Sequence, residues 1–221
     1  MWFPEMLFSK RMAVVTLLAV LVAPTPSRAQ TSATPNLMCA WSTSIAPVDD
    51  WQRLITLGDP YVGNPNSDVT VIEYFDPNCP HCKTLHPIMT RVISDRKDDA
   101  VFYKIPFPLW RYSLPQIEAL YVAAQDNRYH EMLNMQYARQ QPGGLGVDEL
   151  VAIAGEIGLD PVAFSERLER GHNQKTILSR RQEIADLGVR GTPSVMINGR
   201  FVSSDSKSYE CLVQLIDAAG Q

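Results

Sequence analysis

Two cysteines separated by two residues follow closely on an apolar run, and this arrangement most constrains the possible fold. The run from Val69 to Phe75 is rich in β-branched and aromatic side chains, which are typical of a buried strand. The segment from Lys83 to Ser94 has a pattern typical of a helix. We therefore expect Cys79-Pro80-His81-Cys82 at a turn from a strand into a helix.

A Cys-x-x-Cys pair at the start of a helix is typical of a redox-active dithiol. The helix dipole and the free N–H groups of the first turn favour an anion. They therefore lower the pKa of Cys79 and supply the thiolate that attacks disulfides. Pro80 suits this position, because the first turn of a helix tolerates a residue without an N–H group.

The cysteine pair has two alternative interpretations. Cys79 and Cys82 could form a purely structural disulfide, or they could bind zinc or copper together with His81 and His86. His81 is too close to both cysteines to share a tetrahedral ion with them, and the chain has no second Cys-x-x-Cys pair. We therefore expect a redox role for the pair, with no metal and no other cofactor.

Residues 1–29 have the pattern of a secretory signal peptide. Lys10 and Arg11 precede the apolar run 12–23, and the small-residue pattern Ser27-Arg28-Ala29 follows it. The run is shorter than the roughly 20 residues that a membrane-spanning helix needs. We predict cleavage after Ala29 and export to the periplasm, with an uncleaved membrane anchor as the alternative.

The charge and cysteine content restrict the function further. The formal net charge is −4, and it becomes −6 without residues 1–29. The chain has neither a basic stripe nor a Gly-rich phosphate loop, so we expect no nucleic-acid partner.

Four cysteines, an even number, suit an oxidising compartment, and we expect Cys39 and Cys211 to form a structural disulfide. The alternatives are two free thiols or a pair that tunes the redox site.

The order of expected elements predicts the fold. Residues 53–57 could form a short strand, and turn signals follow it. The strand that leads to the cysteines comes next, and a second core strand covers 100–106. Residues 114–187 have helical periodicity with breaks that indicate four or five short helices. An Asn198-Gly199 turn then joins two strands, and a helix covers 206–219.

Without the helical block, the order is βαβ followed by ββα, which is the thioredoxin fold. We predict an α/β thioredoxin fold with an inserted helical subdomain. The predicted parts are a signal peptide (1–29), an N-terminal lead-in (30–52), a thioredoxin-fold domain (53–113 and 188–221) and the inserted subdomain (114–187).

The Cys-Pro-His-Cys motif, the helical insertion and Gly191-Thr192-Pro193 before a hairpin together resemble the DsbA-type thiol:disulfide oxidoreductases. The resemblance covers roughly residues 53–219. It implies that Cys79 is an exposed nucleophile that forms a mixed disulfide with the substrate, and that Cys82 is the buried resolving thiol. It further implies that His81 stabilises the Cys79 thiolate.

The resemblance also implies roles for three residues outside the motif. Pro193 matches a cis-proline opposite the active site, which lets Thr192 present backbone groups to a substrate strand. Glu73 matches a semi-buried acid that handles a proton during exchange. The alternative for Glu73 is an outward position on a solvated edge.

The implied function is a periplasmic oxidase that introduces disulfides into unfolded exported proteins with free thiols. The family resemblance implies reoxidation by a DsbB-type membrane oxidase. No convincing heptads precede residue 53, so we expect a monomer. A threonine before the cis-proline, as at Thr192, also occurs in the reductase and isomerase relatives of this family. A disulfide reductase or isomerase is therefore an alternative function. A periplasmic chaperone or metal-handling module with a vestigial redox site is a further alternative.

Overall fold

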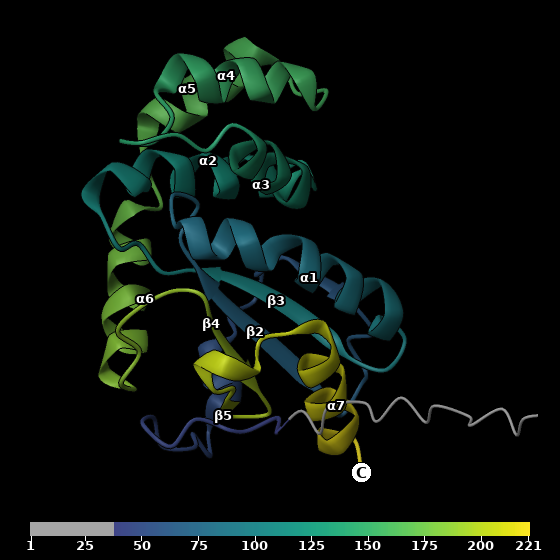
Figure 1. Cartoon of the computed structure of the whole chain (residues 1–221). Coiled ribbons are helices and arrows are strands. Elements are labelled where there is room, and N and C mark those ends of the chain that lie inside the picture. The colour runs from purple at the N-terminus through teal and green to yellow at the C-terminus, as the bar shows by residue number, and fades with distance from the viewer. Residues whose placement is uncertain (1–37) are drawn as a thin grey trace, which may run out of the picture. The chain divides into compact units, whose positions relative to one another are not determined.

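The computed structural model describes residues 38–221 (Figure 1). The predicted signal peptide, residues 1–29, lies outside the described residues. The strands are β1 (Tyr61–Gly63), β2 (Thr70–Phe75), β3 (Val101–Pro106), β4 (Ser194–Ile197) and β5 (Arg200–Phe201). The helices are α1 (Pro80–Arg96), α2 (Leu114–Ala124), α3 (Tyr129–Ala138), α4 (Val147–Glu156), α5 (Pro161–Arg170), α6 (Gln174–Asp186) and α7 (Tyr209–Ala219).

The five strands form one mixed sheet in the order β1-β3-β2-β4-β5. β2 is parallel to β3 and antiparallel to β4. All six residues of β2 are buried, because helices cover both faces of the sheet at this central strand. Burial on both faces explains why the sequence of β2 is a nearly continuous apolar run. Glu73 is an exception, because it is the one charged residue in this buried strand.

The two faces of the sheet follow from the alternation of side chains along β2. Val71 packs with Leu85 and Met89 of α1 and with apolar residues of α7. Ile72 and Tyr74 pack on the opposite face. Successive side chains of a strand point to opposite faces. Glu73 therefore lies on the face that α1 covers, beneath the helix that carries the cysteines.

Helix α6 contributes to the core of the sheet although its sequence groups it with the helical block. Its Ile184 packs with Ile72, Tyr74 and Phe107. The other inserted helices, α2 to α5, stack beyond α1 (Figure 1). Their buried side chains form a second core, which also contains Phe75 and both cysteines of the motif. The insertion therefore packs directly against the redox pair.

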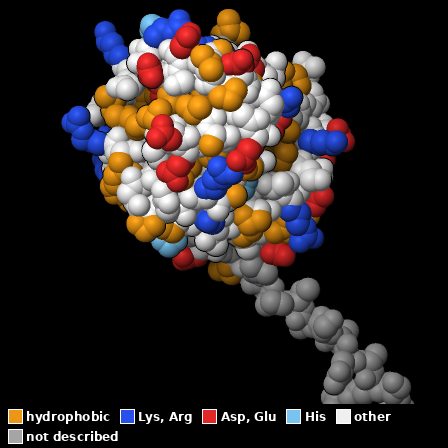
Figure 2. Space-filling view, turned by 90° about the horizontal axis from the view of Figure 1, so that it is seen from above, with side chains coloured by type: hydrophobic (Ala, Val, Ile, Leu, Met, Phe, Trp, Pro, Cys, Tyr) orange, Lys and Arg blue, Asp and Glu red, His pale blue; other side chains and the backbone are white. Residues whose placement is uncertain are grey.

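The surface over the inserted helices carries mixed charges. Seen from above, acidic and basic side chains are interspersed there with apolar ones (Figure 2). None of the helices within residues 38–221 is long and apolar enough to cross a membrane.

A disulfide joins Cys39 to Cys211 of α7, with the two Cα atoms 5.1 Å apart. Next to it, Trp41 forms a single antiparallel bridge to Val202. These contacts fasten the described part of the predicted lead-in to the C-terminal part of the fold. The pairing is the one expected from the even number of cysteines.

The predicted fold class is confirmed, and most predicted elements are present. The helical block contains five helices, and the Asn198-Gly199 turn has positive φ at both residues, 43° and 81°. A side chain at Gly199 would place its Cβ only 2.3 Å from the carbonyl oxygen of Val48, so only glycine fits there.

One local prediction is wrong, and one strand was not predicted. The segment 53–57 is not a strand, because Trp51–Leu54 forms a short 3-10 helix that buries Leu54 in the core. The edge strand β1 lies further along, where Tyr61 and Val62 pair with β3. Its three residues are too few for a recognisable alternation, and turn signals lie on both sides of them in the sequence.

Candidate active site

Cys79 is the N-cap of α1, and Pro80 is the first residue of the helix. The backbone of Cys79 is extended, and its N–H donates to the carbonyl of Asp76 at 3.0 Å. The strand β2 ends only four residues earlier, so the sequence turns sharply from strand to helix at this point. This geometry directs the first N–H groups of α1 toward the Cys79 sulfur.

The loop before β4 covers the sulfur from the other side. The Thr192–Pro193 peptide bond is cis, and the Cys79 Sγ lies 3.3 Å from the Thr192 carbonyl oxygen, to which the protonated thiol donates. Cys79 is consequently only 3% exposed. The expectation of an exposed nucleophile is therefore wrong for this form of the protein, because the cis-proline loop and the apolar side chains of the second core pack around Cys79.

The two cysteines are free thiols with opposite pKa shifts. A hydrogen bond from Cys82 lowers the pKa of Cys79 to about 5, against the effect of burial, and the N–H groups of Cys82 and His81 act in the same direction. Burial raises the pKa of Cys82 far above its ordinary value, and the hydrogen bond to Cys79 adds to the increase. At neutral pH, Cys79 is therefore a thiolate and Cys82 keeps its proton.

Glu73 is fully buried and forms an ion pair with Lys104 of β3. The two residues are direct partners in the parallel register of β2 and β3. Glu73 Oε1 accepts no hydrogen bond among the described residues, so one oxygen remains available to a proton. The charge of Glu73 contributes to the raised pKa of Cys82. The solvated-edge alternative for Glu73 is thereby ruled out.

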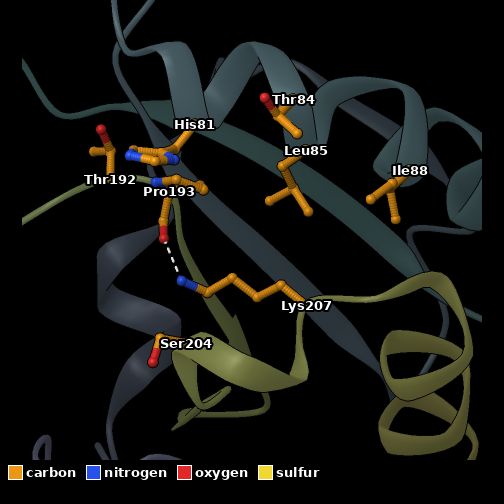
Figure 3. Close-up of a pocket in the computed structure, with 8 residues that line it drawn as sticks. All are labelled: His81, Thr84, Leu85, Ile88, Thr192, Pro193, Ser204 and Lys207. Carbon is orange, nitrogen blue, oxygen red and sulfur yellow. Dashed lines mark hydrogen bonds between the residues drawn. The ribbon is translucent and has the colours of Figure 1, made fainter.

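His81 is exposed and lies at one end of a groove of about 380 Å³ (Figure 3). Thr192 and Pro193 border the groove at the same end, and Leu85 of α1 forms part of its apolar wall. Lys207 extends along the opposite side, and its Nζ donates to the Pro193 carbonyl at 2.6 Å. The groove therefore begins beside His81 of the redox motif and continues along α1.

Asp76 is a second buried carboxylate, three residues before Cys79. It accepts hydrogen bonds from the N–H groups of Asn78 (2.7 Å) and Leu109 (2.6 Å) and from the hydroxyl of Ser113 (2.9 Å). Burial raises its pKa, and these hydrogen bonds oppose that effect. Asp76 thus ties the turn before the cysteines to the loop that follows β3.

Gln140 links the inserted helices to the same turn. It follows α3, and its Nε2 donates to the carbonyls of Pro77 (2.9 Å) and Cys79 (3.1 Å). Within residues 38–221, no three His, Cys, Asp or Glu side chains are grouped so that they could hold a metal ion.

The sequence model of the Thioredoxin family matches residues 56–218. The chain belongs to the thioredoxin family. The predicted resemblance to DsbA-type thiol:disulfide oxidoreductases is confirmed at the level of family and fold. The chain is similar to the thiol-disulfide exchange protein α-DsbA2 from Wolbachia pipientis, with a TM-score of 0.65 and 24% identity, covering 76% of this chain and 91% of that one.

Two curated relatives of this thioredoxin-family chain differ in kind. A putative protein-disulfide oxidoreductase of Rickettsia typhi is 24% identical over 170 residues, covering 73% of this chain and 62% of that protein. The Na(+)/H(+) antiporter NhaA 3 of Salinispora tropica is 29% identical over 143 residues, covering 62% of this chain but only 21% of the antiporter. The chain thus spans less than two thirds of the length of either relative.

Sequence reasoning missed four residues of this thioredoxin-family site, Lys104, Asp76, Gln140 and Lys207. Lys104 left a signal, since it is the only charged residue in the second core strand as Glu73 is in the first. Asp76 precedes a proline in a turn. This position explains its hydrogen bond from the N–H group of Asn78, but it does not predict that the carboxylate is buried. Gln140 and Lys207 left no signal, because their contacts join segments distant in the sequence.

Proposed function

We propose that the chain is an exported protein-thiol oxidase that passes a Cys79–Cys82 disulfide to newly exported proteins. The observation that supports this most directly is the pair of opposite pKa shifts at the two cysteines. A stabilised Cys79 thiolate stabilises the reduced form of the protein, and a stable reduced form makes the disulfide a strong oxidant.

The exchange proceeds in two steps. A substrate thiolate attacks the Cys79 sulfur, a mixed disulfide forms, and Cys82 leaves and takes up a proton because its pKa is raised. A second substrate thiolate then attacks the substrate sulfur, and Cys79 leaves as a thiolate. The substrate loses two electrons and two protons. The enzyme dithiol gains the electrons and one proton, and the other proton passes to water.

Glu73 is the group proposed to handle the proton of Cys82. It lies on the α1 face of the sheet, and one of its oxygens has no hydrogen-bond partner among the described residues. Lys104 keeps a compensating positive charge beside it in the core. Thr192, next to the cis-proline, is proposed to pair its backbone groups with an extended substrate segment, as the Cys79 sulfur already uses its carbonyl.

We further propose that the protein works in the periplasm, in support of which the sequence offers the signal-peptide pattern of residues 1–29. Its reduced dithiol would there be reoxidised by a membrane oxidase of the DsbB type. Unfolded exported proteins with free thiols are the proposed substrates, and the protein is proposed to act as a monomer.

Equilibration with glutathione tests the direction of electron flow. We expect a reduction potential closer to about −120 mV, the value of a strongly oxidising DsbA, than to about −270 mV, the value of thioredoxin. A potential near that of thioredoxin would make the protein a reductase and overturn the oxidase proposal.

Variants of the two cysteines test whether the protein is an enzyme at all. Cys79→Ser should abolish the oxidative refolding of a reduced substrate protein. Cys82→Ser, which keeps the nucleophile but cannot resolve, should accumulate a mixed disulfide that is visible by mass spectrometry. Unchanged protection of unfolded proteins by both variants, without any trapped substrate, would instead indicate a chaperone.

A further inference from the structure

We propose that Lys207 makes the groove beside Cys79 select cysteines that have an acidic side chain nearby in the substrate. The inference rests on the proposed function, because it names the peptides that the same site prefers. The occupant is one extended, thiol-bearing peptide with a carboxylate within a few residues of its cysteine.

The groove has one apolar side and one cationic side. Leu85 and Ile88 of α1 form the apolar side, and Thr84 lies beside them with its hydroxyl bonded to the Pro80 carbonyl (Figure 3). Lys207 lies across from them and points toward Pro193, with Ser204 below it (Figure 3). Among the described residues that line this groove, Lys207 is the one Lys or Arg, and none is Asp or Glu. The groove therefore complements a peptide that is apolar on one side and anionic on the other.

The ammonium of Lys207 has donors to spare. It carries three N–H groups, and within residues 38–221 its one hydrogen bond is to the Pro193 carbonyl. No carboxylate of the described residues lies within 4.0 Å of its Nζ, since it forms no ion pair there. Two donors can therefore bind a substrate carboxylate without breaking the contact that holds the cis-proline loop.

The position of the ammonium matches a residue close to the substrate cysteine. Lys207 contacts the carbonyl of Pro193, and the Cys79 sulfur contacts the carbonyl of the residue before it, Thr192. Consecutive Cα atoms are about 3.8 Å apart. A peptide whose sulfur is bonded to Cys79 therefore brings the residues one to three positions from its cysteine within reach of Lys207.

Partial burial strengthens this interaction. Lys207 is half-buried, and burial lowers its pKa, so its ammonium has lost part of its water shell. A charge-assisted hydrogen bond to a carboxylate therefore stabilises this ammonium more than it would stabilise a fully hydrated ammonium on the surface. The overall charge of the protein is −4, which by itself disfavours acidic peptides. A preference for acidic peptides would thus have a local origin.

The test compares short peptides that each contain one cysteine and one variable residue. Glu, Gln or Lys is placed in turn at one to three residues before or after the cysteine. The rate of thiol exchange with the oxidised full-length protein is followed by stopped-flow fluorescence. We expect the Glu peptide to react about 3–10 times faster than the Gln peptide at the best position, a ratio that corresponds to a single charge-assisted contact. Added salt should reduce this ratio.

Two variants identify the residue responsible. Lys207→Met should bring the Glu-to-Gln rate ratio to about 1, whatever its effect on the rate with the Gln peptide, because it also removes the contact to the Pro193 carbonyl. Lys207→Arg should retain the ratio. Lys83→Met is the matched control, because Lys83 is an exposed lysine next to Cys82 that does not line the groove. It should leave the ratio unchanged.

The possible outcomes separate this inference from the proposed function. Equal rates for Glu and Gln peptides at every position in the unaltered protein, or a Glu preference that survives in Lys207→Met, would overturn the inference alone. If Lys207→Met does not fold, the ratio in the unaltered protein and in Lys207→Arg decides. An absence of exchange with any peptide would overturn both the proposed function and this inference.

Discussion

The Cys79 sulfur is held between the first N–H groups of α1 and the carbonyl of Thr192. The first of these contacts stabilises a thiolate, while the second restricts access from solvent. Cys82, beneath it, remains protonated because it is buried and lies near Glu73. At the scale of single residues, the site is therefore built to keep a charge on one sulfur and a proton on the other.

The stability of the reduced protein should rise between pH 5 and pH 9. The folded pKa of Cys79 is about 5, below its ordinary value of 9.0, so in this range the unfolded chain binds a proton that the folded protein does not. The free energy of unfolding should rise by about 1.4 kcal/mol per pH unit relative to the disulfide form. Below pH 5 this contribution is lost, because both states are then protonated.

Urea unfolding of the reduced and the disulfide-bonded protein at several pH values measures this difference. The disulfide form has no titrating thiol at either position, and it is therefore the internal control for all other groups. A difference between the two forms that does not change with pH would contradict the lowered pKa of Cys79.

Among the elements, the contact between the inserted helices and the turn before α1 has the clearest consequence. Gln140, after α3, bonds the carbonyls of Pro77 and Cys79. The second core, which includes Leu120 of α2 and Leu133 of α3, packs around both cysteines. The insertion is thus part of the redox site, and it should restrict motion of the turn that carries the nucleophile.

Gln140→Ala should loosen this turn. Two backbone carbonyls lose a donor, which we expect to cost about 1 kcal/mol of stability. Hydrogen–deuterium exchange of residues 78–82 should become faster. The matched control is Gln141→Ala, since Gln141 is exposed and bonds Gly144 and Glu149 rather than the turn. Equal protection of residues 78–82 in the two variants would show that Gln140 does not hold the turn.

At the scale of the whole molecule, the disulfide between Cys39 and Cys211 closes a loop of large sequence separation, 172 residues. It fastens the segment before the sheet to the last helix, on the α7 side of the fold. The sheet, α1 and the inserted helices all lie within the closed loop, so the disulfide limits the unfolded states of most of the described chain.

Replacing both cysteines, Cys39→Ala with Cys211→Ala, should therefore lower stability without altering the redox pair. The chain-entropy model gives an upper limit of about 5 kcal/mol for so long a loop. The urea midpoint should fall, whereas the exchange rate with a neutral peptide should stay within twofold of the parent. An unchanged midpoint would mean that the disulfide adds nothing to stability, and a large loss of exchange rate would indicate that it tunes the active site.

The sequence by itself determined the features that depend on neighbouring residues. The apolar run before the motif, the proline after Cys79 and the Asn198-Gly199 turn each encode a local backbone geometry, so the fold class followed from their order. Cys79 and Cys82 were recognisable for the same reason. The short edge strand β1 was not, since its pairing with β3 rather than its own residues makes it a strand.

Only the tertiary structure decided which distant groups surround the dithiol. Lys104 faces Glu73 through the register of two parallel strands, and Lys207 reaches the groove from the segment after the hairpin. The carbonyl that contacts the Cys79 sulfur belongs to a residue 113 positions away in the sequence. Burial, charge and access are properties of packed neighbours rather than of sequence neighbours, and they determine the chemistry of Cys79-Pro80-His81-Cys82.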